Sequence, residues 1–462
     1  MAVLPTGWGK SLLYQVPALL LSQPVLVVSP LIALMRDQEA ALRRRGVPVV
    51  RLDSTLKVST RRQSLARIAK GGRLIVLTTP ETLESEGARP AIEAARPALL
   101  CVDEAHCITE WGHDFRPAYL RLGAERRALS IPTALALTAT ATPRVQEHIA
   151  ERLALDDPLV VLAPPHRKNL RLSVEEAPGN LKLEVAGRLI RKLARPGIVY
   201  CSTTRAVDEI FGALTRARIP AARYHGKMKT SDRTAAQRRF MKSGRKILMV
   251  ATNAFGMGVD KPDIRSIVHY QLPGSLEQYV QEAGRAGRDG KPSRCILLFD
   301  EDDLDIQAYL QEQGRPSGSQ LRRVAATLAA WSTEQRAVST KDLAASAGVG
   351  RTTAASLCAQ LEGAGLLELD AKRRWHVRVG VRTLTDSATD LSKRFETIRR
   401  QDAARLRAVG GYALTEACRS VFIRRWFGEA QPPECGKCDR CQAKRHLART
   451  LARARERAGG RS

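Results

Sequence analysis

Several features of membrane, exported and repeat proteins are missing from this sequence. No apolar run approaches the roughly 20 residues that a bilayer-spanning helix requires. The opening residues, Met1 to Pro5, lack the basic and apolar regions of a signal peptide. No unit of 20 to 50 residues repeats along the chain, as it would in a solenoid. These absences predict a globular protein of the cytoplasm that has no membrane partner.

Acidic residues are scarce relative to basic ones. The 462 residues include 75 Lys and Arg against 47 Asp and Glu, which gives 75 − 47 = +28. An excess of this size indicates a polyanionic partner, because each phosphate neutralised by Lys or Arg releases a condensed counterion. A basic, solvated surface in an Arg-rich protein is the alternative. Charge does not distinguish DNA from RNA.

Nine cysteines in a chain without an export signal argue against a disulfide framework. Five of them stand singly in apolar or mixed surroundings and are predicted to be small core residues. These five are Cys101, Cys107, Cys201, Cys295 and Cys358. The other four form a cluster near the C-terminus.

Roughly the first 300 residues alternate short β-branched runs with helical patterns, which predicts parallel α/β sheets. The expected strands are Val25–Ser29, Leu74–Thr78, Ala98–Val102, Thr133–Leu137, Gly197–Tyr200, Ile247–Val250 and Ile267–His269. The expected helices include Leu31–Arg45, Ser231–Lys242 and Leu276–Ala283. Pro164-Pro165 interrupts the pattern near its middle and indicates a linker between two such units.

The pattern of alternating strands and helices ends at a hinge-like stretch, Gly314 to Ser319. Three helical patterns and two short strand-like pieces follow, which is typical of a winged helix. The helices are Gln320–Ala330, Thr340–Ala347 and Arg351–Gly363, and the strands are Leu366–Leu369 and Trp375–Val379. Lys372, Arg373 and Arg374 would form the basic tip of the wing. The chain is predicted to be helical again from about Thr383 to Phe427, and the basic tail from Lys444 to Arg461 is either helical or a disordered arm.

A phosphate-binding loop is predicted at Pro5-Thr6-Gly7-Trp8-Gly9-Lys10-Ser11, directly before a helical run. Backbone amides of such a loop, at a helix N-terminus, cradle phosphates. Lys10 would reach the β- and γ-phosphates, and Ser11 would ligate Mg²⁺. Leu4 stands where the usual pattern has its first glycine, so an accidental turn is the alternative.

Two adjacent acids, Asp103 and Glu104, end the expected strand Ala98–Val102. Successive side chains at a strand end point to opposite sides, so the two carboxylates can take different roles. Asp103 would hold Mg²⁺ through its water shell, and Glu104 would orient the attacking water.

Arg285 and Arg288 lie in the second α/β unit, where their spacing places them on one helical face. An arginine supplied across a cleft stabilises charge that develops on the γ-phosphate, so hydrolysis would require the cleft to close. A basic, solvated helix is the alternative.

Taken together, these motifs resemble those of superfamily-two helicases, and specifically the RecQ family. Further matching pieces are Ser29 to Met35, Thr138 to Thr142, Tyr224-His225-Gly226 and Ala251 to Pro262. The resemblance implies an α/β fold of two RecA-like lobes, at 1–163 and 164–316. A winged-helix-like domain at 317–382, a helical zinc platform at 383–443 and a basic tail at 444–462 would follow. It also implies that Gly258 and Asp260 take part in nucleotide binding.

The segment from Trp111 to Tyr119 resembles the aromatic-rich loop of RecQ helicases, which is implied to sense single-stranded DNA. Trp111 and Phe115 can stack on bases without sequence preference, and His113 and Arg116 would complete the DNA contact. Glycine and polar positions interrupt the segment, which argues against simple core packing.

The clustered cysteines, Cys418, Cys435, Cys438 and Cys441, fit a closed tetrahedral Zn²⁺ site. An iron–sulfur cluster is the rival, although the cysteine and proline expected after Cys441 in a ferredoxin-type run are missing. A cluster without metal is the third alternative. The flanking residues resemble the RecQ zinc platform.

The chain departs from the family in two ways. The winged-helix-like segment stands before the zinc platform, whereas most RecQ proteins have it afterwards. The chain also starts at the phosphate loop, without the upstream adenine-recognition segment of the family. We therefore keep open, beside the motor, a DNA-binding protein with a truncated, inactive motor; an RNA-directed helicase is a third reading.

The resemblance implies an ATP- and Mg²⁺-dependent DNA helicase, moving 3′→5′, that acts in recombination and repair. Its substrates would be single-stranded and forked or junction DNA. We expect a monomer associated with the nucleoid, and the sequence identifies no protein partner.

Overall fold

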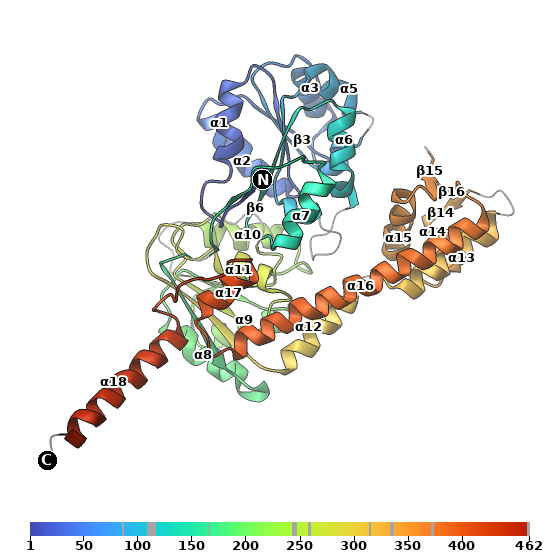
Figure 1. The fold of residues 1–462 in the computed structure, drawn as a ribbon. Coiled ribbons are helices and arrows are strands. Elements are labelled where there is room, and N and C mark those ends of the chain that lie inside the picture. The colour runs from blue at the N-terminus through green and yellow to red at the C-terminus, as the bar shows by residue number, and fades with distance from the viewer. Residues whose placement is uncertain are drawn as a thin grey trace. The chain divides into compact units, whose positions relative to one another are not determined.

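The computed structural model describes residues 1–85, 87–108, 117–165, 167–242, 247–256, 260–313, 316–332, 337–370 and 374–459. They form two compact units, one made of residues 1–305 with 408–462 and the other of residues 306–407. The first unit contains two sheets, and the second contains a small sheet with its own helices (Figure 1).

The first sheet has seven strands in the order β3-β4-β2-β5-β6-β1-β7, and every pairing is parallel. The strands are β1 (Ala2–Val3), β2 (Val25–Val28), β3 (Val49–Leu52), β4 (Ile75–Thr78), β5 (Leu99–Val102), β6 (Thr133–Thr138) and β7 (Val161–Leu162). The helices of this lobe are α1 (Leu12–Leu20), α2 (Ile32–Arg44), α3 (Val58–Ala69), α4 (Pro80–Leu83), α5 (Arg89–Ala95), α6 (Leu122–Ala128) and α7 (Pro143–Arg152). Two short 3₁₀ helices, η1 (Ala105–Ile108) and η2 (Pro117–Arg121), follow β5.

Both faces of this sheet are covered, which is why its central strands are continuous apolar runs. Buried side chains of α1 and α2 pack on one face, and those of α3, α5, α6 and α7 pack on the other. The predicted parallel α/β lobe is thereby confirmed.

The second sheet has six parallel strands in the order β10-β11-β9-β12-β13-β8. They are β8 (Leu170–Glu176), β9 (Gly197–Tyr200), β10 (Ala221–Tyr224), β11 (Leu248–Ala251), β12 (Ser266–His269) and β13 (Ser293–Phe299). The helices are α8 (Lys182–Lys192), which follows η3 (Gly179–Leu181), α9 (Thr204–Arg216), α10 (Thr230–Met241) and α11 (Leu276–Ala283). Helices α8 and α9 pack on one face, while α10, α11 and the cysteine-containing segment pack on the other.

The second unit has the three predicted helices and a small antiparallel sheet, in which a third strand, Val338–Ser339, accompanies the two predicted ones. Its elements are α13 (Gly318–Ser332), β14 (Val338–Ser339), α14 (Thr340–Ser346), α15 (Arg351–Gly363), β15 (Leu367–Leu369) and β16 (Arg374–Val377). The strand order is β14-β16-β15, with both pairings antiparallel. The helices α12 (Asp302–Gln313) and α16 (Val381–Leu414) each include residues of both units.

The helical region after Thr383 ends earlier than the sequence indicated. Helix α16 stops at Leu414, and Cys418 is the N-cap of a separate helix, α17 (Arg419–Trp426). The described part of the basic tail is helical, because it belongs to α18 (Asp439–Gly459) (Figure 1). The five single cysteines are all buried, as predicted for core residues.

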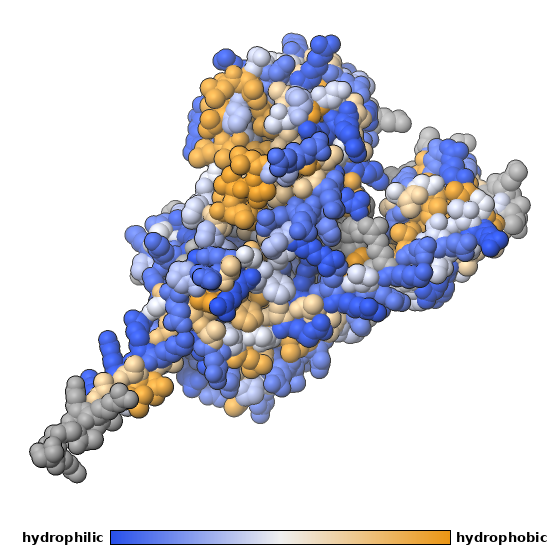
Figure 2. Space-filling model, viewed as in Figure 1, coloured by the Kyte–Doolittle hydropathy of each residue, from blue (hydrophilic) through white to orange (hydrophobic). Residues whose placement is uncertain are grey.

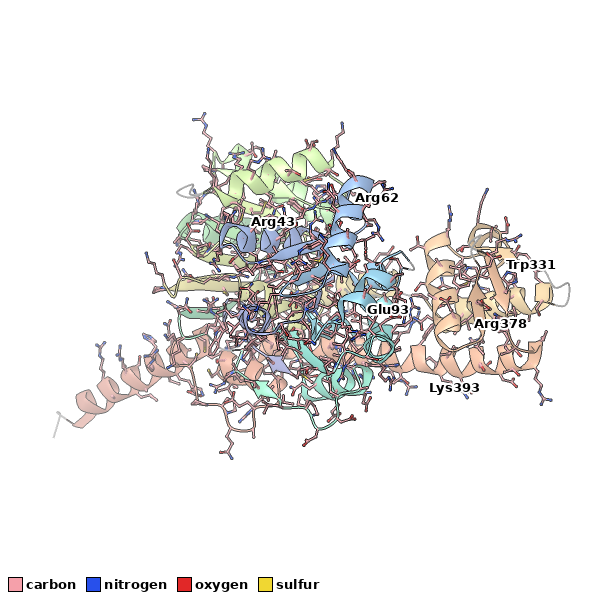
Figure 3. All side chains as sticks on the ribbon, turned by 90° about the horizontal axis from the view of Figure 1, so that it is seen from above. Arg43, Arg62, Glu93, Trp331, Arg378 and Lys393 are labelled. Carbon is pink, nitrogen blue, oxygen red and sulfur yellow. The ribbon has the colours of Figure 1, made fainter. Side chains whose placement is uncertain are left out.

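The surface carries both strong charge and one apolar face. Basic side chains project from each unit, for example Arg62 on α3 and Lys393 on α16 (Figure 3). By contrast, α1 exposes large apolar side chains, which form part of the orange surface in Figure 2. These residues are Leu12, Leu13, Val16, Leu19 and Leu20. Contiguous apolar surface of this kind marks a site of association with other chains or of aggregation. Within the described residues, no helix is both long and apolar enough to cross a bilayer.

Candidate functional site

The predicted phosphate loop connects β1 to α1 and has the backbone of an anion-binding turn. Gly7 and Gly9 adopt φ values of +88° and +78°, which side-chain-bearing residues rarely tolerate. Lys10 Nζ donates a hydrogen bond to the Leu4 carbonyl oxygen at 3.0 Å. Burial lowers the pKa of Lys10, whereas the nearby carboxylates of Glu104 and Asp103 raise it. The Lys10 ammonium therefore lies close enough to the predicted acids to interact with their charges.

Asp103 and Glu104 follow β5 directly, at the carboxyl ends of the parallel strands, where the phosphate loop also lies. Burial raises the pKa of Asp103 to about 7, and the charge of Glu104 adds to this effect while Lys10 opposes it. A divalent cation at the carboxylate would reverse that shift, as metals do at acidic sites. Glu104 has a φ of +50°, an uncommon backbone conformation that is frequent at functional positions.

A chain of polar contacts leads from Glu104 to the end of β6. His106 Nδ1 lies 3.4 Å from Glu104 Oε2 and 3.0 Å from Thr138 Oγ1. The Thr138 hydroxyl also donates to the carbonyl oxygen of Thr140, at 3.1 Å, and accepts from its N–H. These polar contacts join the acid pair to the Thr138–Thr142 motif, a connection that the sequence motifs alone did not reveal.

The two predicted arginines do not lie on a helix, so the expected helical face is wrong. Helix α11 ends at Ala283, and Arg285 and Arg288 lie in the consecutive turns that follow, residues 284–289. We call residues 284–289 the arginine turn. Within this turn, Gly287 takes a φ of +55°, which is incompatible with a continuing helix.

Arg288 is the arginine that meets the phosphate loop. A Cβ built at Gly7 would lie 3.5 Å from the Arg288 Cγ, which is van der Waals contact. The Arg288 side chain therefore lies directly against the phosphate loop. Arg288 Nη1 donates to Asp260 Oδ1 at 2.6 Å, and burial lowers the Arg288 pKa against the effect of Asp260. Arg285 lies deeper in the second lobe, where its Nη2 would be 3.1 Å from a Cβ at Gly256.

The loop, the acids and Arg288 thus converge in one place, with Thr6 also facing the turn. A Cβ at Gly284 would lie 3.8 Å from the Thr6 Cβ. Lys10, Asp103 and Arg288 interact electrostatically across this site. Ser11 is the first residue before α1 and makes no side-chain cap, so its hydroxyl is not committed to the helix end. Gly258 lies outside the described residues.

The four clustered cysteines form a second site. Their Sγ atoms all lie within 4.8 Å of one another. Cys418 Sγ is 3.5 Å from Cys435 Sγ and 3.9 Å from Cys438 Sγ. Four sulfurs that each lie about 2.3 Å from a tetrahedral zinc ion would be about 3.8 Å apart, so these residues fit Zn²⁺.

The segment around these cysteines, residues 415–442, is anchored to β8 and α11; we call it the zinc module. Trp426 Nε1 donates to Glu277 Oε1 in α11 at 3.0 Å, and Val174 N–H in β8 donates to Asp439 Oδ2 at 3.1 Å. The buried Arg419 holds Asp439 with three further hydrogen bonds, at 3.0, 3.2 and 2.9 Å. Burial alone would raise the Asp439 pKa, but Arg419 and the N–H groups of Val174 and Arg440 together outweigh it, and the pKa is lowered.

The predicted DNA contacts are only partly within the described residues. Arg374 begins β16 and is about half exposed, with its backbone N–H donating to Asp370 Oδ1 at 2.8 Å. The remaining predicted contacts, Trp111, His113, Phe115, Arg116, Lys372 and Arg373, lie outside the described residues. Tyr119, at the end of the aromatic-rich segment, is buried and donates to the Asp103 carbonyl oxygen at 3.2 Å. That bond ties Tyr119 to the acid pair.

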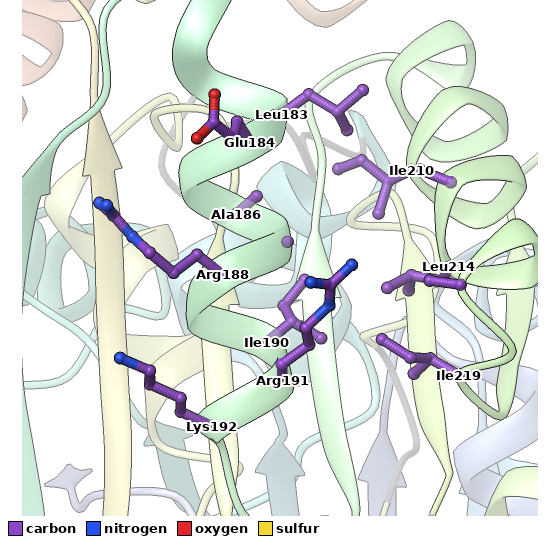
Figure 4. A pocket seen from close by; sticks show the side chains of 13 residues that line it. Leu183, Glu184, Ala186, Arg188, Ile190, Arg191, Lys192, Ile210, Leu214 and Ile219 are labelled. Atoms are coloured by element: carbon purple, nitrogen blue, oxygen red, sulfur yellow. The ribbon is translucent and has the colours of Figure 1, made fainter.

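One groove lies away from all of these residues. It has a volume of about 500 Å³ and runs between α8 and α9 (Figure 4). Ile210, Leu214 and Ile219 line one side, whereas Arg188 and Lys192 extend away from α9. The groove contains none of the predicted site residues.

Two residues with a close relation to the arginine turn escaped the sequence analysis. Arg167 and Asn169 follow the Pro164-Pro165 linker and donate hydrogen bonds to carbonyl oxygens of the turn. Their partners lie more than 110 residues further along the chain. The only signal in the sequence is a pair of polar side chains directly before a buried strand.

Comparison with known proteins gives three family matches. The descriptions are DEAD/DEAH box helicase at residues 1–149, helicase conserved C-terminal domain at 181–290, and RecQ zinc-binding at 381–442. The last match favours zinc over the iron–sulfur alternative.

Two curated relatives from Bacillus subtilis match most of the chain. The probable ATP-dependent DNA helicase RecS is 39% identical over 77% of this chain and 71% of its own length. The ATP-dependent DNA helicase RecQ is 33% identical over 95% of this chain and 61% of its own length. The chain thus spans about six to seven tenths of these relatives.

A solved structure shows the same fold at low identity. The Mycobacterium smegmatis helicase Lhr, bound to single-stranded DNA and AMP-PNP, has a TM-score of 0.53 and 23% identity. The match covers 84% of this chain and 57% of that protein.

Proposed function

Because this chain belongs to the RecQ family of DNA helicases, we propose that it is an ATP-driven motor that moves 3′→5′ along single-stranded DNA and unwinds duplexes. The observation that best supports a motor is the position of Arg288. This arginine belongs to the second lobe, yet its side chain lies against Gly7 of the phosphate loop in the first. A nucleotide bound there would touch both lobes.

Each residue of the site has a role in this proposal. The backbone of Thr6, Gly7 and Gly9 cradles the phosphates, and Lys10 binds the β- and γ-phosphates. Ser11 and Asp103 hold Mg²⁺, which neutralises charge on the phosphates when bound.

The remaining residues act on the γ-phosphate. Glu104 orients the attacking water, and Arg288, supported by Arg285, stabilises the charge that develops during transfer. Asp260 keeps the Arg288 guanidinium in place through the 2.6 Å hydrogen bond. The predicted participation of Gly258 belongs to the same proposal. Hydrolysis then requires both lobes to be in contact, so each turnover is coupled to their closure and release.

DNA binding is assigned to two segments. Trp111, His113, Phe115 and Arg116 would contact single-stranded DNA close to the acid pair, a location supported by the Tyr119 hydrogen bond to Asp103. Lys372, Arg373 and Arg374 would contact duplex DNA at a wing. Forked or junction DNA, acted on in recombination and repair at the nucleoid, is the substrate class proposed for such a motor.

The division of the chain into working parts is also a proposal. We assign nucleotide binding to the lobes at 1–163 and 164–316, duplex contacts to 317–382, structural support to the zinc platform at 383–443, and phosphate contacts to the tail at 444–462. The break between the two sheets, after β7 and before β8, supports the first of these boundaries. We propose a monomer as the working form. The apolar face of α1 would favour association instead, so sedimentation over a concentration series is the check.

The decisive experiment measures ATP hydrolysis with and without single-stranded DNA for the chain and for its Lys10→Ala and Glu104→Gln variants. We expect DNA to stimulate hydrolysis strongly. Lys10→Ala should lower both ATP affinity and turnover, whereas Glu104→Gln should keep ATP affinity and lower kcat by at least about 100-fold. Strand separation on substrates with 3′ or 5′ tails then reports the direction.

Two results would contradict the proposal. Turnover that persists in both variants would place the chemistry elsewhere. Absence of turnover in the unmodified chain, with salt-sensitive DNA binding and one zinc per chain retained, would instead indicate a DNA-binding protein with an inactive motor.

A further inference from the structure

The arginine turn is not held in place by its own helix. Helix α11 ends at Ala283, and beyond it the turn has short-range backbone bonds, such as Arg285 N–H to the Glu282 carbonyl oxygen at 3.2 Å. Two backbone bonds also reach an earlier segment, one of them from Asp289 N–H to the Pro262 carbonyl oxygen at 3.2 Å. Gly287 N–H bonds to the Ile264 carbonyl oxygen at 2.8 Å. The carbonyl oxygen of Gly287 accepts from Gly290 N–H at 3.0 Å. Those of Gly284 and Ala286 need other partners, since backbone acceptors away from water need partners.

One guanidinium serves all three of these oxygens. Arg167 Nη1 donates to the Gly284 carbonyl oxygen at 2.8 Å and to that of Ala286 at 2.9 Å. Arg167 Nη2 donates to the Gly287 carbonyl oxygen. The planar, multi-donor fork of arginine suits several acceptors at once, which a lysine ammonium on a flexible stem does less well.

A second side chain from the same segment closes the turn. Asn169 Nδ2 donates to the carbonyl oxygens of Gly287 and Lys291, at 2.7 and 2.9 Å. The fit is close enough that a Cβ at Gly287 would come within 2.5 Å of Asn169 Nδ2.

We propose that Arg167 and Asn169 are positioning residues, which hold the arginine turn so that Arg288 faces the phosphate loop. This inference rests on the proposed function, because it assigns the support of a group that acts in ATP hydrolysis. Arg167 and Asn169 come shortly after the linker between the lobes. Their hydrogen bonds therefore connect the start of the second lobe to the arginine turn. Movement of the second lobe about that linker then carries Arg288 with it.

The first test compares Arg167→Ala and Asn169→Ala with Arg216→Ala, which removes an exposed arginine from α9 in the same lobe. Misplacing a catalytic group by about 1 Å costs up to about 100-fold in rate. We therefore expect kcat for DNA-stimulated ATP hydrolysis to fall between about tenfold and 100-fold in Arg167→Ala, and less in Asn169→Ala. The KM for ATP and the Kd for single-stranded DNA should stay within about twofold, and Arg167→Lys should restore kcat in part.

A double-variant comparison tests whether Arg167 acts through Arg288. Residues that work as one unit are non-additive, so adding Arg167→Ala to Arg288→Ala should cause little further loss of kcat. A full multiplicative loss would overturn the proposal. So would a weaker Kd for DNA with unchanged kcat, because that result would make Arg167 a DNA contact.

Hydrogen exchange measures the positioning itself, without relying on activity. The amides of residues 284–290 should exchange faster in Arg167→Ala and Asn169→Ala than in the unmodified chain, while the amides of α8 stay unchanged. Unchanged exchange in the arginine turn would refute the inference even in an active motor. Faster exchange in a chain that hydrolyses no ATP would leave the positioning intact and count against the proposed function alone.

Discussion

At Gly287, one hydrogen atom in place of a side chain decides the shape of the arginine turn. Its φ is +55°, and a Cβ there would approach Asn169 Nδ2, Ser293 Oγ and the Lys291 carbonyl oxygen at 2.5, 2.6 and 2.8 Å. Real Cβ atoms do not come so close to such neighbours. Arg288 follows this residue directly, so the backbone at Gly287 determines where the arginine leaves the turn.

Gly287→Ala should therefore lower kcat for ATP hydrolysis by at least about tenfold while the chain remains folded. Gly290→Ala is the matched control, because Gly290 has a φ of +80° but nothing within 4 Å of its Cβ position. A positive φ alone costs about 1–2 kcal/mol, so the control reports backbone strain without the collision. Equal kcat losses in the two variants would show that the contacts with Asn169 and Ser293 are irrelevant.

The sequence predicted best those residues whose role is defined by near neighbours. Lys10, Asp103 and Glu104 each belong to a short motif next to a strand, and the structure places them together. Arg167 could not be found in this way, since its acceptors are 117 to 120 residues away. No local pattern encodes a contact that only the folded second lobe creates.

At the scale of elements, the zinc module links two parts of the second lobe. It contacts α11 through Trp426 and β8 through Asp439. Tyr412, near the end of α16, also shares a 2.9 Å hydroxyl hydrogen bond with Tyr279 of α11. Helix α11 leads into the arginine turn, and β8 begins just after Arg167. The zinc module therefore contacts both of the elements that flank the segments we propose to position Arg288.

Removing the metal should loosen these two elements. Cys438→Ser should lose zinc and lower Tm by about 10 °C or more, given that each kcal/mol lost shifts Tm by about 2–4 °C in domains of about 150–250 residues. Hydrogen exchange in β8 and α11 should increase several-fold, and kcat should fall with it.

Cys358→Ser is the control for this experiment, because Cys358 is equally buried but belongs to no cluster. It should keep one zinc per chain and normal exchange in α11. A Cys438→Ser chain that loses zinc but keeps the exchange pattern of β8 and α11 would disprove the link.

Elements were predictable where their pattern was unambiguous. Leu276–Ala283 was predicted with the bounds that α11 has, and β9 matches its expected range. Six strands of the two parallel sheets were not among those expected, namely β1, β3, β7, β8, β10 and β13. Four of them, β3, β7, β8 and β10, lie at edges of their sheets, whereas β1 and β13 are interior strands. Edge strands carry exposed polar positions, such as Arg171 and Arg223, that interrupt the apolar run expected of a buried parallel strand.

For the whole molecule, the net charge of +28 sets the strength of DNA binding but not its location. The sequence placed duplex contacts at Lys372, Arg373 and Arg374, next to the small antiparallel sheet of the second unit. The structure describes only Arg374 of these, at the start of β16. An experiment that separates local binding from overall charge is therefore needed.

Replacing Lys372, Arg373 and Arg374 with serine should weaken binding to duplex DNA and lower the salt dependence of binding. Each phosphate that a cation neutralises adds about 0.9 to the slope of log K against log salt, so the slope should fall by about 0.9 for each phosphate that is no longer bound. The matched control replaces Lys393, Arg399 and Arg400 with serine, since these three cations are exposed, lie in the same unit and carry the same total charge. A wing that binds DNA gives a clear difference between the two triple variants, at unchanged ATP hydrolysis with saturating single-stranded DNA. Equal weakening would mean that duplex binding depends on the total positive charge, and the wing would then have no special role.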